Sequence, residues 1–295
     1  MPHSEDGFSR RQAIKLAGLA LLHSAINRHG RIPPHKIQSF DTCETLHPDL
    51  WERLKESTGM VRQIPQHMPI RALDWKGRCG TCFHAGHGDF LTNRHVMFNG
   101  PQLEYPYSTT PVLETCIGHP AYRFNDVRSA THFNFADLAL ASTGVVNYTT
   151  LSLTASIPQV LDPVYSCTYQ GDTLHRHGRF AIHPIRARYI GRIPIYEKRL
   201  RFPQDSIVLA TDLDPYDEVP RFSSGASGAP IVDSSGNVFG VLRSTKHILP
   251  DAEKRYLAML FNLDPSTIRS IAYAVPLNAR HIRSFLESRG IKYLP

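Results

Sequence analysis

The stretch of the sequence best suited to chemistry is the run Gly225–Pro230, which places Ser227 between Ala226 and Gly228. Glycine and small residues on both sides of a serine suit a tight turn that presents one hydroxyl and leaves backbone N–H groups free beside it. Turns of this composition are also common in loops that do no chemistry. A serine becomes a nucleophile only when a base is close by, usually a histidine oriented by a carboxylate. The hypothesis therefore requires both elsewhere in the chain.

A histidine and an aspartate in suitable settings precede this turn. Phe90 and Leu91 are typical of the end of a buried strand, from which His95 would project on a rigid element. Asp137 interrupts an apolar run, where a carboxylate is costly to bury without a partner such as a histidine N–H. Taken alone, Asp137 equally suits a turn before a strand. Together, the three residues predict a base, its orienting carboxylate and a nucleophile.

Around these residues the sequence resembles trypsin/chymotrypsin-like serine proteases, nearest to the bacterial HtrA-like or glutamyl-endopeptidase-like branch and without a PDZ domain. The resemblance rests on Leu91–Val96, Asp137–Leu140 and Gly225–Pro230, in the order His, Asp, Ser that the family uses. It implies that His95, Asp137 and Ser227 form a catalytic triad. It also implies that the backbone N–H groups of Gly225 and Ser227 form the oxyanion hole.

The resemblance implies an all-β fold of two six-stranded antiparallel β-barrels with a C-terminal α-helix. The residues agree, because Ile231–Leu242 reads as two strands around a tight turn and 278–288 as an amphipathic helix. At 295 residues and 41% hydrophobic, the chain can bury the cores of two small barrels. The expected organisation is a signal segment (1–26), a linker or pro-region with one short helix near 49–57 (27–65), a first barrel (66–158) and a second barrel with the helix (159–295).

Substrate preference is less clearly encoded. The resemblance places Arg221 near the floor of the primary pocket, and Leu242, Arg243 and Ser244 on the strand that pairs with the substrate backbone. An arginine in the pocket could select acidic side chains by bidentate pairing. However, Leu242 stands where glutamyl endopeptidases have a histidine, and a difference in loop length would place Arg221 outside the pocket. Ala226 replaces the aspartate of trypsin-like zymogens, which implies that their activation switch is absent.

The N-terminus is typical of an export signal. Arg10 and Arg11 are followed by the apolar run Leu16–Leu22, the pattern of a twin-arginine signal peptide. The alternative is a plain basic amphipathic helix. From such a signal we expect a periplasmic or secreted protein. Because the run is too short to span a bilayer, we expect no stable membrane insertion.

The five cysteines are too few and too odd in number for a disulfide scaffold, although one or two bridges could form after export. Cys79, Cys82, His84 and His87 have spacing that zinc could use. The alternatives are ordinary strand residues or a local redox pair, and the resemblance places the segment in a hairpin of the first barrel. We therefore expect no metal and no cofactor.

The formal net charge of +7 is concentrated partly between His175 and Arg201. Arginines alternating with isoleucine and tyrosine there indicate a half-buried strand with a solvated face, and nucleic-acid binding needs more than charge. We expect a peptide or protein substrate and no nucleic acid, with an oligomeric state that the sequence does not indicate. The sequence thus predicts an exported serine endopeptidase. The alternatives are a catalytically silent homologue that acts as a binding module and a basic protein that binds acidic polymers.

Overall fold

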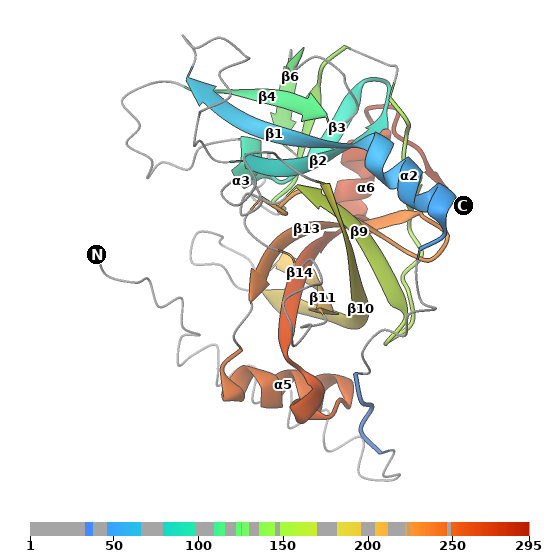
Figure 1. Cartoon of the computed structure of the whole chain (residues 1–295), viewed down its shortest axis with the longest axis vertical. Coiled ribbons are helices and arrows are strands. Elements are labelled where there is room, and N and C mark those ends of the chain that lie inside the picture. Colours follow the sequence, from blue (N-terminus) through green and yellow to red (C-terminus); the bar gives the residue numbers. More distant parts are fainter. Residues whose placement is uncertain are drawn as a thin grey trace.

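The structure is a computed structural model, and it describes residues 33–37, 46–65, 79–97, 109–115, 122–124, 126–129, 136–144, 148–169, 182–195, 204–211, 222, 225–246 and 249–294. Over these residues the fold consists mainly of strands. They form two halves, which lie one above the other in Figure 1.

The N-terminal half is a seven-stranded antiparallel sheet with the order β5-β4-β1-β2-β3-β7-β6. Helix α2 (Pro48–Ser57) leads directly into its first strand, and the short helix α3 (Arg94–Met97) follows its third. The strands are β1 (Thr58–Pro65), β2 (Cys79–Gly86), β3 (Asp89–Thr92), β4 (Thr109–Thr115), β5 (Tyr122–Arg123), β6 (Asp126–Ser129) and β7 (Ala139–Ser142).

The C-terminal half contains a closed six-stranded antiparallel barrel. Its order is β12-β9-β10-β11-β14-β13, and pairing between β12 and β13 closes the ring. The barrel strands are β9 (Pro163–Tyr169), β10 (Ile182–Ile195), β11 (Gln204–Thr211), β12 (Pro230–Val232), β13 (Val238–Lys246) and β14 (Ser270–Pro276). Two short strands, β8 (Leu153–Thr154) and β15 (Tyr293–Leu294), extend the sheet beside β13. The helices are α5 (Asp251–Phe261), the 3-10 turn η2 (Pro265–Thr267) and α6 (Arg280–Glu287).

The predicted all-β fold with a C-terminal helix is confirmed, and one six-stranded barrel is present. The hairpin predicted over Ile231–Leu242 is β12–β13, and the predicted C-terminal helix is α6. Among the described residues of the N-terminal half, no pairing between β5 and β6 closes the seven-stranded sheet. A second closed barrel therefore stays a prediction.

The segment expected to be a linker or pro-region (27–65) contributes to both halves. Strand β1 pairs with β2 on one edge and β4 on the other, so the sheet begins at Thr58 rather than after residue 65. Arg62 and Gln63 on β1 are polar, yet both side chains are buried. Further upstream, the backbone N–H of His35 donates to Asn262 O at 2.7 Å, beside α5. Parts of the expected linker thus belong to the folded protein.

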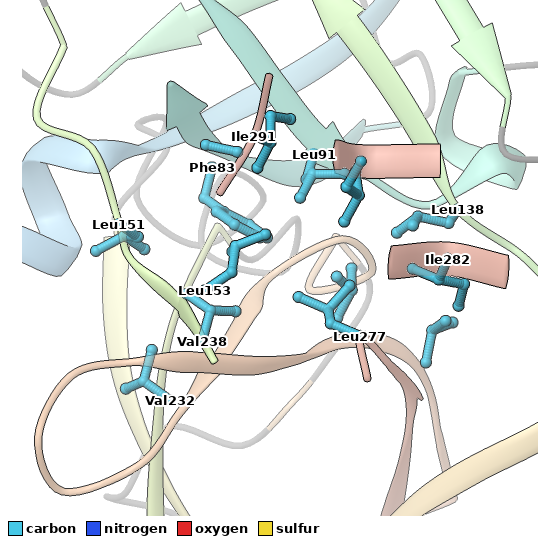
Figure 2. Close-up of a cluster of buried hydrophobic side chains, with 14 of the residues drawn as sticks. Phe83, Leu91, Leu138, Leu151, Leu153, Val232, Val238, Leu277, Ile282 and Ile291 are labelled. Carbon is cyan, nitrogen blue, oxygen red and sulfur yellow. The ribbon is translucent and has the colours of Figure 1, made fainter. Parts of the chain in front are cut away.

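Helix α6 and a buried apolar cluster join the two halves. Figure 2 shows side chains from β2, β3, β8, β12, β13 and α6 converging on one region. Because residues of both sheets share this cluster, separating the halves would expose it to water. The described members labelled in the figure are Phe83, Leu91, Leu138, Leu151, Leu153, Val232, Val238, Leu277, Ile282 and Ile291.

Candidate active site

The N-terminal half supplies a histidine–aspartate pair. His95 lies in α3 directly after β3, and Asp137 lies just before β7, the neighbour of β3 in the sheet. His95 Nδ1 is 2.6 Å from Asp137 Oδ2, and the backbone N–H of His95 donates to Asp137 Oδ1 at 3.0 Å. Because a carboxylate only accepts, Nδ1 carries the proton and Nε2 is left as an acceptor. This tautomer is the one that a general base requires.

Three residues that sequence reasoning missed hold this pair in place. The Asn93 side-chain amide donates to the backbone carbonyl of Asp137 at 2.9 Å. The Gln63 amide donates to the carbonyl of Val96 at 2.8 Å. A Cβ atom on Gly80 would lie 2.5 Å from Val96 Cγ1, so the absence of a side chain lets β2 approach α3 closely. Asn93 lies within the histidine motif and could have been singled out there, whereas Gln63 and Gly80 are adjacent to that motif only in the fold.

Asp137 also faces a buried arginine from the other half. Arg243 on β13 is 5% exposed, and its Nε lies 3.7 Å from Asp137 Oδ2. Burial by itself would raise the pKa of Asp137, but the hydrogen bond from His95, the charge of the His95 ring when it is protonated and the charge of Arg243 hold that pKa below its ordinary value of 3.8. The carboxylate is therefore ionised at neutral pH. Burial lowers the pKa of Arg243, and the charge of Asp137 offsets part of this effect.

The C-terminal half supplies Ser227, in the turn that leads into β12. Gly225 and Gly228 have φ angles of +96° and +93°, a region that residues with a Cβ rarely adopt. The Ser227 hydroxyl donates to the backbone carbonyl of Arg243 at 3.1 Å. No hydrogen bond joins Ser227 to His95 among the contacts of the described residues. Arg243 touches Ser227 through its backbone and Asp137 through its side chain, so the predicted site residues from both halves lie around it.

The predicted substrate-binding residues differ in their surroundings. Arg221 lies outside the described residues. Leu242 is fully buried in the apolar cluster of the barrel, and its carbonyl accepts the Gly228 N–H at 2.8 Å. Ser244 is exposed, and the register of β13 against β14 shifts between Leu242 and Ser244, at Arg243. Of the strand predicted to meet the substrate, Ser244 thus presents a side chain to solvent.

The segment with zinc-like spacing lies on β2 and in the turn after it. Cys82 is a free, buried thiol whose pKa is raised by burial. His84 is buried, and its Nε2 accepts the Gly88 N–H at 3.1 Å. Within the described ranges, no group of three or more His, Cys, Asp or Glu residues could hold a metal ion. Cys82 and His84 are buried residues of a strand, and the absence of a metal stays a prediction.

The basic strand is β10, and its arginines contact other parts of the fold. Arg188 donates to the carbonyl of Leu161 at 3.2 Å. Arg192 donates to Asn278 Oδ1 at 2.9 Å and also pairs with Asp205. The alternation of buried and half-buried positions along β10 agrees with a strand that has one solvated face. The absence of a nucleic-acid partner stays a prediction.

The sequence comparison decides the family. A profile of the trypsin-like peptidase domain matches residues 80–241, which is more than half of the chain. The chain belongs to the trypsin-like peptidase family. As a member of this family, the protein is a serine protease and therefore a hydrolase. No curated protein matches the chain in sequence.

Solved structures of a protease share the fold. The active form of the Rv3671c protease from M. tuberculosis is similar with a TM-score of 0.57 and 18% identity, covering 91% of this chain and 96% of that chain. The inactive form of the Rv3671c protease has a TM-score of 0.54 and 17% identity, covering 88% of this chain and 100% of that chain. At these identities the likeness concerns the fold.

Proposed function

We propose that this trypsin-like peptidase is an exported endopeptidase that cleaves peptide bonds through an acyl-enzyme formed on Ser227. The observation that carries the proposal is the His95–Asp137 pair at 2.6 Å, held by one half of the molecule. The glycine-flanked serine turn of the other half lies beside the same Arg243. His95 is the general base, Asp137 its orienting carboxylate and Ser227 the nucleophile.

In the proposed reaction, Ser227 Oγ attacks the scissile carbonyl carbon while its proton passes to His95 Nε2. The tetrahedral intermediate collapses when His95 returns that proton to the leaving amine, and the acyl group stays on Ser227. Water then attacks the acyl-enzyme through the same base and releases the acid. In this proposal the Ser227 hydroxyl first leaves the Arg243 carbonyl, to which it donates in the structure, and turns towards His95.

The oxyanion hole in this proposal consists of the backbone N–H groups of Gly225 and Ser227. The positive φ of Gly225 supports this role, because a turn of this kind directs successive N–H groups to one side. Donors fixed in this way stabilise the charge that develops on the carbonyl oxygen. Loss of one donor typically costs about 3 kcal/mol in the transition state.

The proposed substrate is a peptide segment that pairs with the edge of β13. Strand β12 pairs with β13 only as far as Val241, whereas β14 pairs with it as far as Lys246. Over the described residues, the edge of β13 next to Ser244 is thus left without a strand, and an extended peptide could add to it. Selection of acidic side chains by Arg221 remains part of the proposal. A panel of peptides varied before the scissile bond tests it, and a preference for Phe or Arg would contradict it.

Export is proposed from the paired arginines and the apolar run Leu16–Leu22 that follows them. No helix in the described part of the chain has the length and apolarity needed to cross a bilayer. Changing both Arg10 and Arg11 to lysine should keep the protein in the cytoplasm, as cell fractionation would measure, because twin-arginine signals are read through that pair. Unchanged localisation of the variant would favour a plain basic helix.

The experiment that tests the proposed chemistry is labelling of the purified protein by a fluorophosphonate. Labelling should occur on the native protein and be lost in Ser227→Ala and His95→Ala. Ser235→Ala is the matched control, because Ser235 lies in the β12–β13 turn away from the site. A folded native protein that does not label would favour the alternative of a catalytically silent binding module.

A further inference from the structure

Thr81, on β2, connects the two halves at the serine turn. Its backbone N–H donates to the carbonyl of Ser227 at 2.8 Å, and its hydroxyl donates to the carbonyl of Gly225 at 2.8 Å. The Thr81 carbonyl accepts the Thr92 hydroxyl at 2.6 Å, and Thr81 Oγ1 accepts the Tyr169 N–H at 3.1 Å. One residue thus bonds to the serine turn, to β9 and to the strand that leads to His95.

The direction of the Thr81 hydroxyl follows from the chemistry of its partners. A backbone N–H such as that of Tyr169 can only donate, so the oxygen of the hydroxyl must accept it. The single hydroxyl proton is then directed to the Gly225 carbonyl. Thr81 has no exposed surface, so water does not replace either bond.

The serine turn needs such an anchor because glycine constrains its own backbone weakly. Gly225 has no Cβ and adopts a φ of +96°, so the peptide groups on either side of it rotate readily. Thr81 fixes the carbonyls of Gly225 and Ser227, which bracket the peptide group that carries the Ser227 N–H. The fit is close, since a Cβ on Gly228 would lie 1.9 Å from the Thr81 carbonyl oxygen.

We propose that Thr81 is a positioning residue whose hydroxyl holds the serine turn so that the N–H groups of Gly225 and Ser227 face the developing oxyanion. Through its carbonyl, the same residue fixes Thr92, three residues before His95, relative to that turn. Thr81 thereby fixes the turn that carries Ser227 and the strand that leads to His95 relative to each other. This inference rests on the proposed function, because it assigns Thr81 a role in the acyl transfer at Ser227.

The hydroxyl is tested by comparing Thr81→Val with Thr81→Ser. Valine keeps the shape of the side chain and removes the hydroxyl, whereas serine keeps the hydroxyl. For hydrolysis of a peptide ester or amide we expect Thr81→Val to lower kcat by about 10- to 100-fold with KM changed by less than about twofold, because oxyanion donors act mainly in the transition state. Thr81→Ser should stay within about threefold of the native kcat, since its hydroxyl can make the same bonds.

Ser166→Ala is the matched control for loss of a buried hydroxyl near the turn. Ser166 on β9 is buried, and its hydroxyl donates to the carbonyl of Pro230 at 2.7 Å, three residues after Ser227. The Ser166→Ala substitution removes a bond of the same type, from a buried hydroxyl to a backbone carbonyl, and leaves the bond from Thr81 to Gly225 in place. We expect its kcat to stay within about threefold of the native value even where its denaturation midpoint falls as much as that of Thr81→Val.

Hydrogen exchange over residues 225–230 separates failure of this inference from failure of the proposed function. Thr81→Val should accelerate exchange in this segment relative to the native protein and to Thr81→Ser, whether or not the native protein labels with fluorophosphonate. Unchanged exchange, an unchanged kcat in Thr81→Val, or an equal loss of kcat in Thr81→Ser would overturn the role of the hydroxyl. If the native protein did not label with fluorophosphonate while Thr81→Val exchanged faster over residues 225–230, the bond from Thr81 to the serine turn would still be supported. The proposed function would then be contradicted.

Discussion

The two sides of the site are built in different ways. The N-terminal half holds His95 through side-chain bonds and charge: His95 is paired with Asp137, which accepts a bond from Asn93 and faces Arg243 of the other half. The C-terminal half holds Ser227 through backbone geometry, with glycines at positive φ on either side. Substitutions on the first side should therefore act through protonation and charge, and those on the second through volume and backbone strain. Substitutions of Asp137, Gly228 and Arg243 test this difference, from the largest expected effect to the smallest, and a fourth at His84 tests the effect of burial outside the site.

Asp137→Asn should have the largest effect, because it removes the acceptor for the proton on His95 Nδ1. In the Ser-His-Asp template, this change lowers kcat by about 10⁴-fold by favouring the wrong tautomer while the geometry stays intact. Steady-state kinetics on a peptide substrate measures it. Asp233→Asn is the control, since Asp233 accepts backbone N–H bonds in the β12–β13 turn and should leave kcat within about twofold. If Asp137→Asn retained a tenth of the native kcat, His95 would not depend on the carboxylate.

Gly228→Ala should act through volume. Its Cβ would lie 1.9 Å from the Thr81 carbonyl oxygen, on top of the strain of a φ of +93°, so the free energy of unfolding should fall by about 4 kcal/mol or more. Gly86→Ala is the matched control. Gly86 also has a positive φ, but the nearest atom to an added Cβ is 3.8 Å away, so backbone strain of about 1–3 kcal/mol alone is expected. Denaturant titration compares the two, and equal losses would mean that the close packing against Thr81 is unimportant.

Arg243→Gln should act through charge and should show its effect at acid pH. The guanidinium is one cause of the lowered pKa of Asp137, so its removal moves that pKa up towards 3.8. Stability from an ionised carboxylate with a lowered pKa is present above the ordinary pKa and is lost as the pH falls through the lowered one. The variant should therefore lose stability at a higher pH than the native protein, in addition to about 3 kcal/mol at neutral pH.

Denaturation midpoints from pH 3 to pH 7 would measure the effect of Arg243→Gln. Arg243→Lys is the control that keeps a positive charge on a flexible stem. The prediction fails if the glutamine variant and the native protein lose stability over the same acid range. In that case, the charge of Arg243 would not affect the pKa of Asp137, and the ionisation of Asp137 would depend on its pairing with His95 alone.

Substitution of His84 should have the smallest effect, a change in the free energy of unfolding that is limited to weakly acid solution. Burial is the main cause of its lowered pKa, although bonds to backbone carbonyls oppose it. Between the ordinary value of 6.5 and the lowered pKa, the unfolded chain binds more protons, so stability falls as the pH falls, by up to about 1.4 kcal/mol per pH unit. The slope of the unfolding free energy against pH should be shallower in His84→Asn. Equal slopes in His84→Asn and the native protein would exclude His84 as the source of this pH dependence.

The elements that sequence reasoning predicted well are those encoded by neighbouring residues. The β12–β13 hairpin and helix α6 follow from periodicity and turn residues within a short stretch. Strand β1 was missed because Arg62 and Gln63 suggest solvent exposure. Their burial depends on β2 and α3, and the bond from Gln63 to Val96 joins residues 33 positions apart. The composition of the neighbouring residues does not indicate such distant partners.

The sequence by itself determined the family, the types of the three expected site residues and the tight glycine turn around Ser227, because each depends on a short run of residues. Only the tertiary structure decided that Thr81 holds that turn and that Arg243 faces Asp137. The bond from Thr81 to Gly225 spans 144 positions of the chain, and the pair of Arg243 with Asp137 crosses between the two halves. These two contacts form only when the two sheets pack together, and no local pattern in the sequence marks either residue's partner.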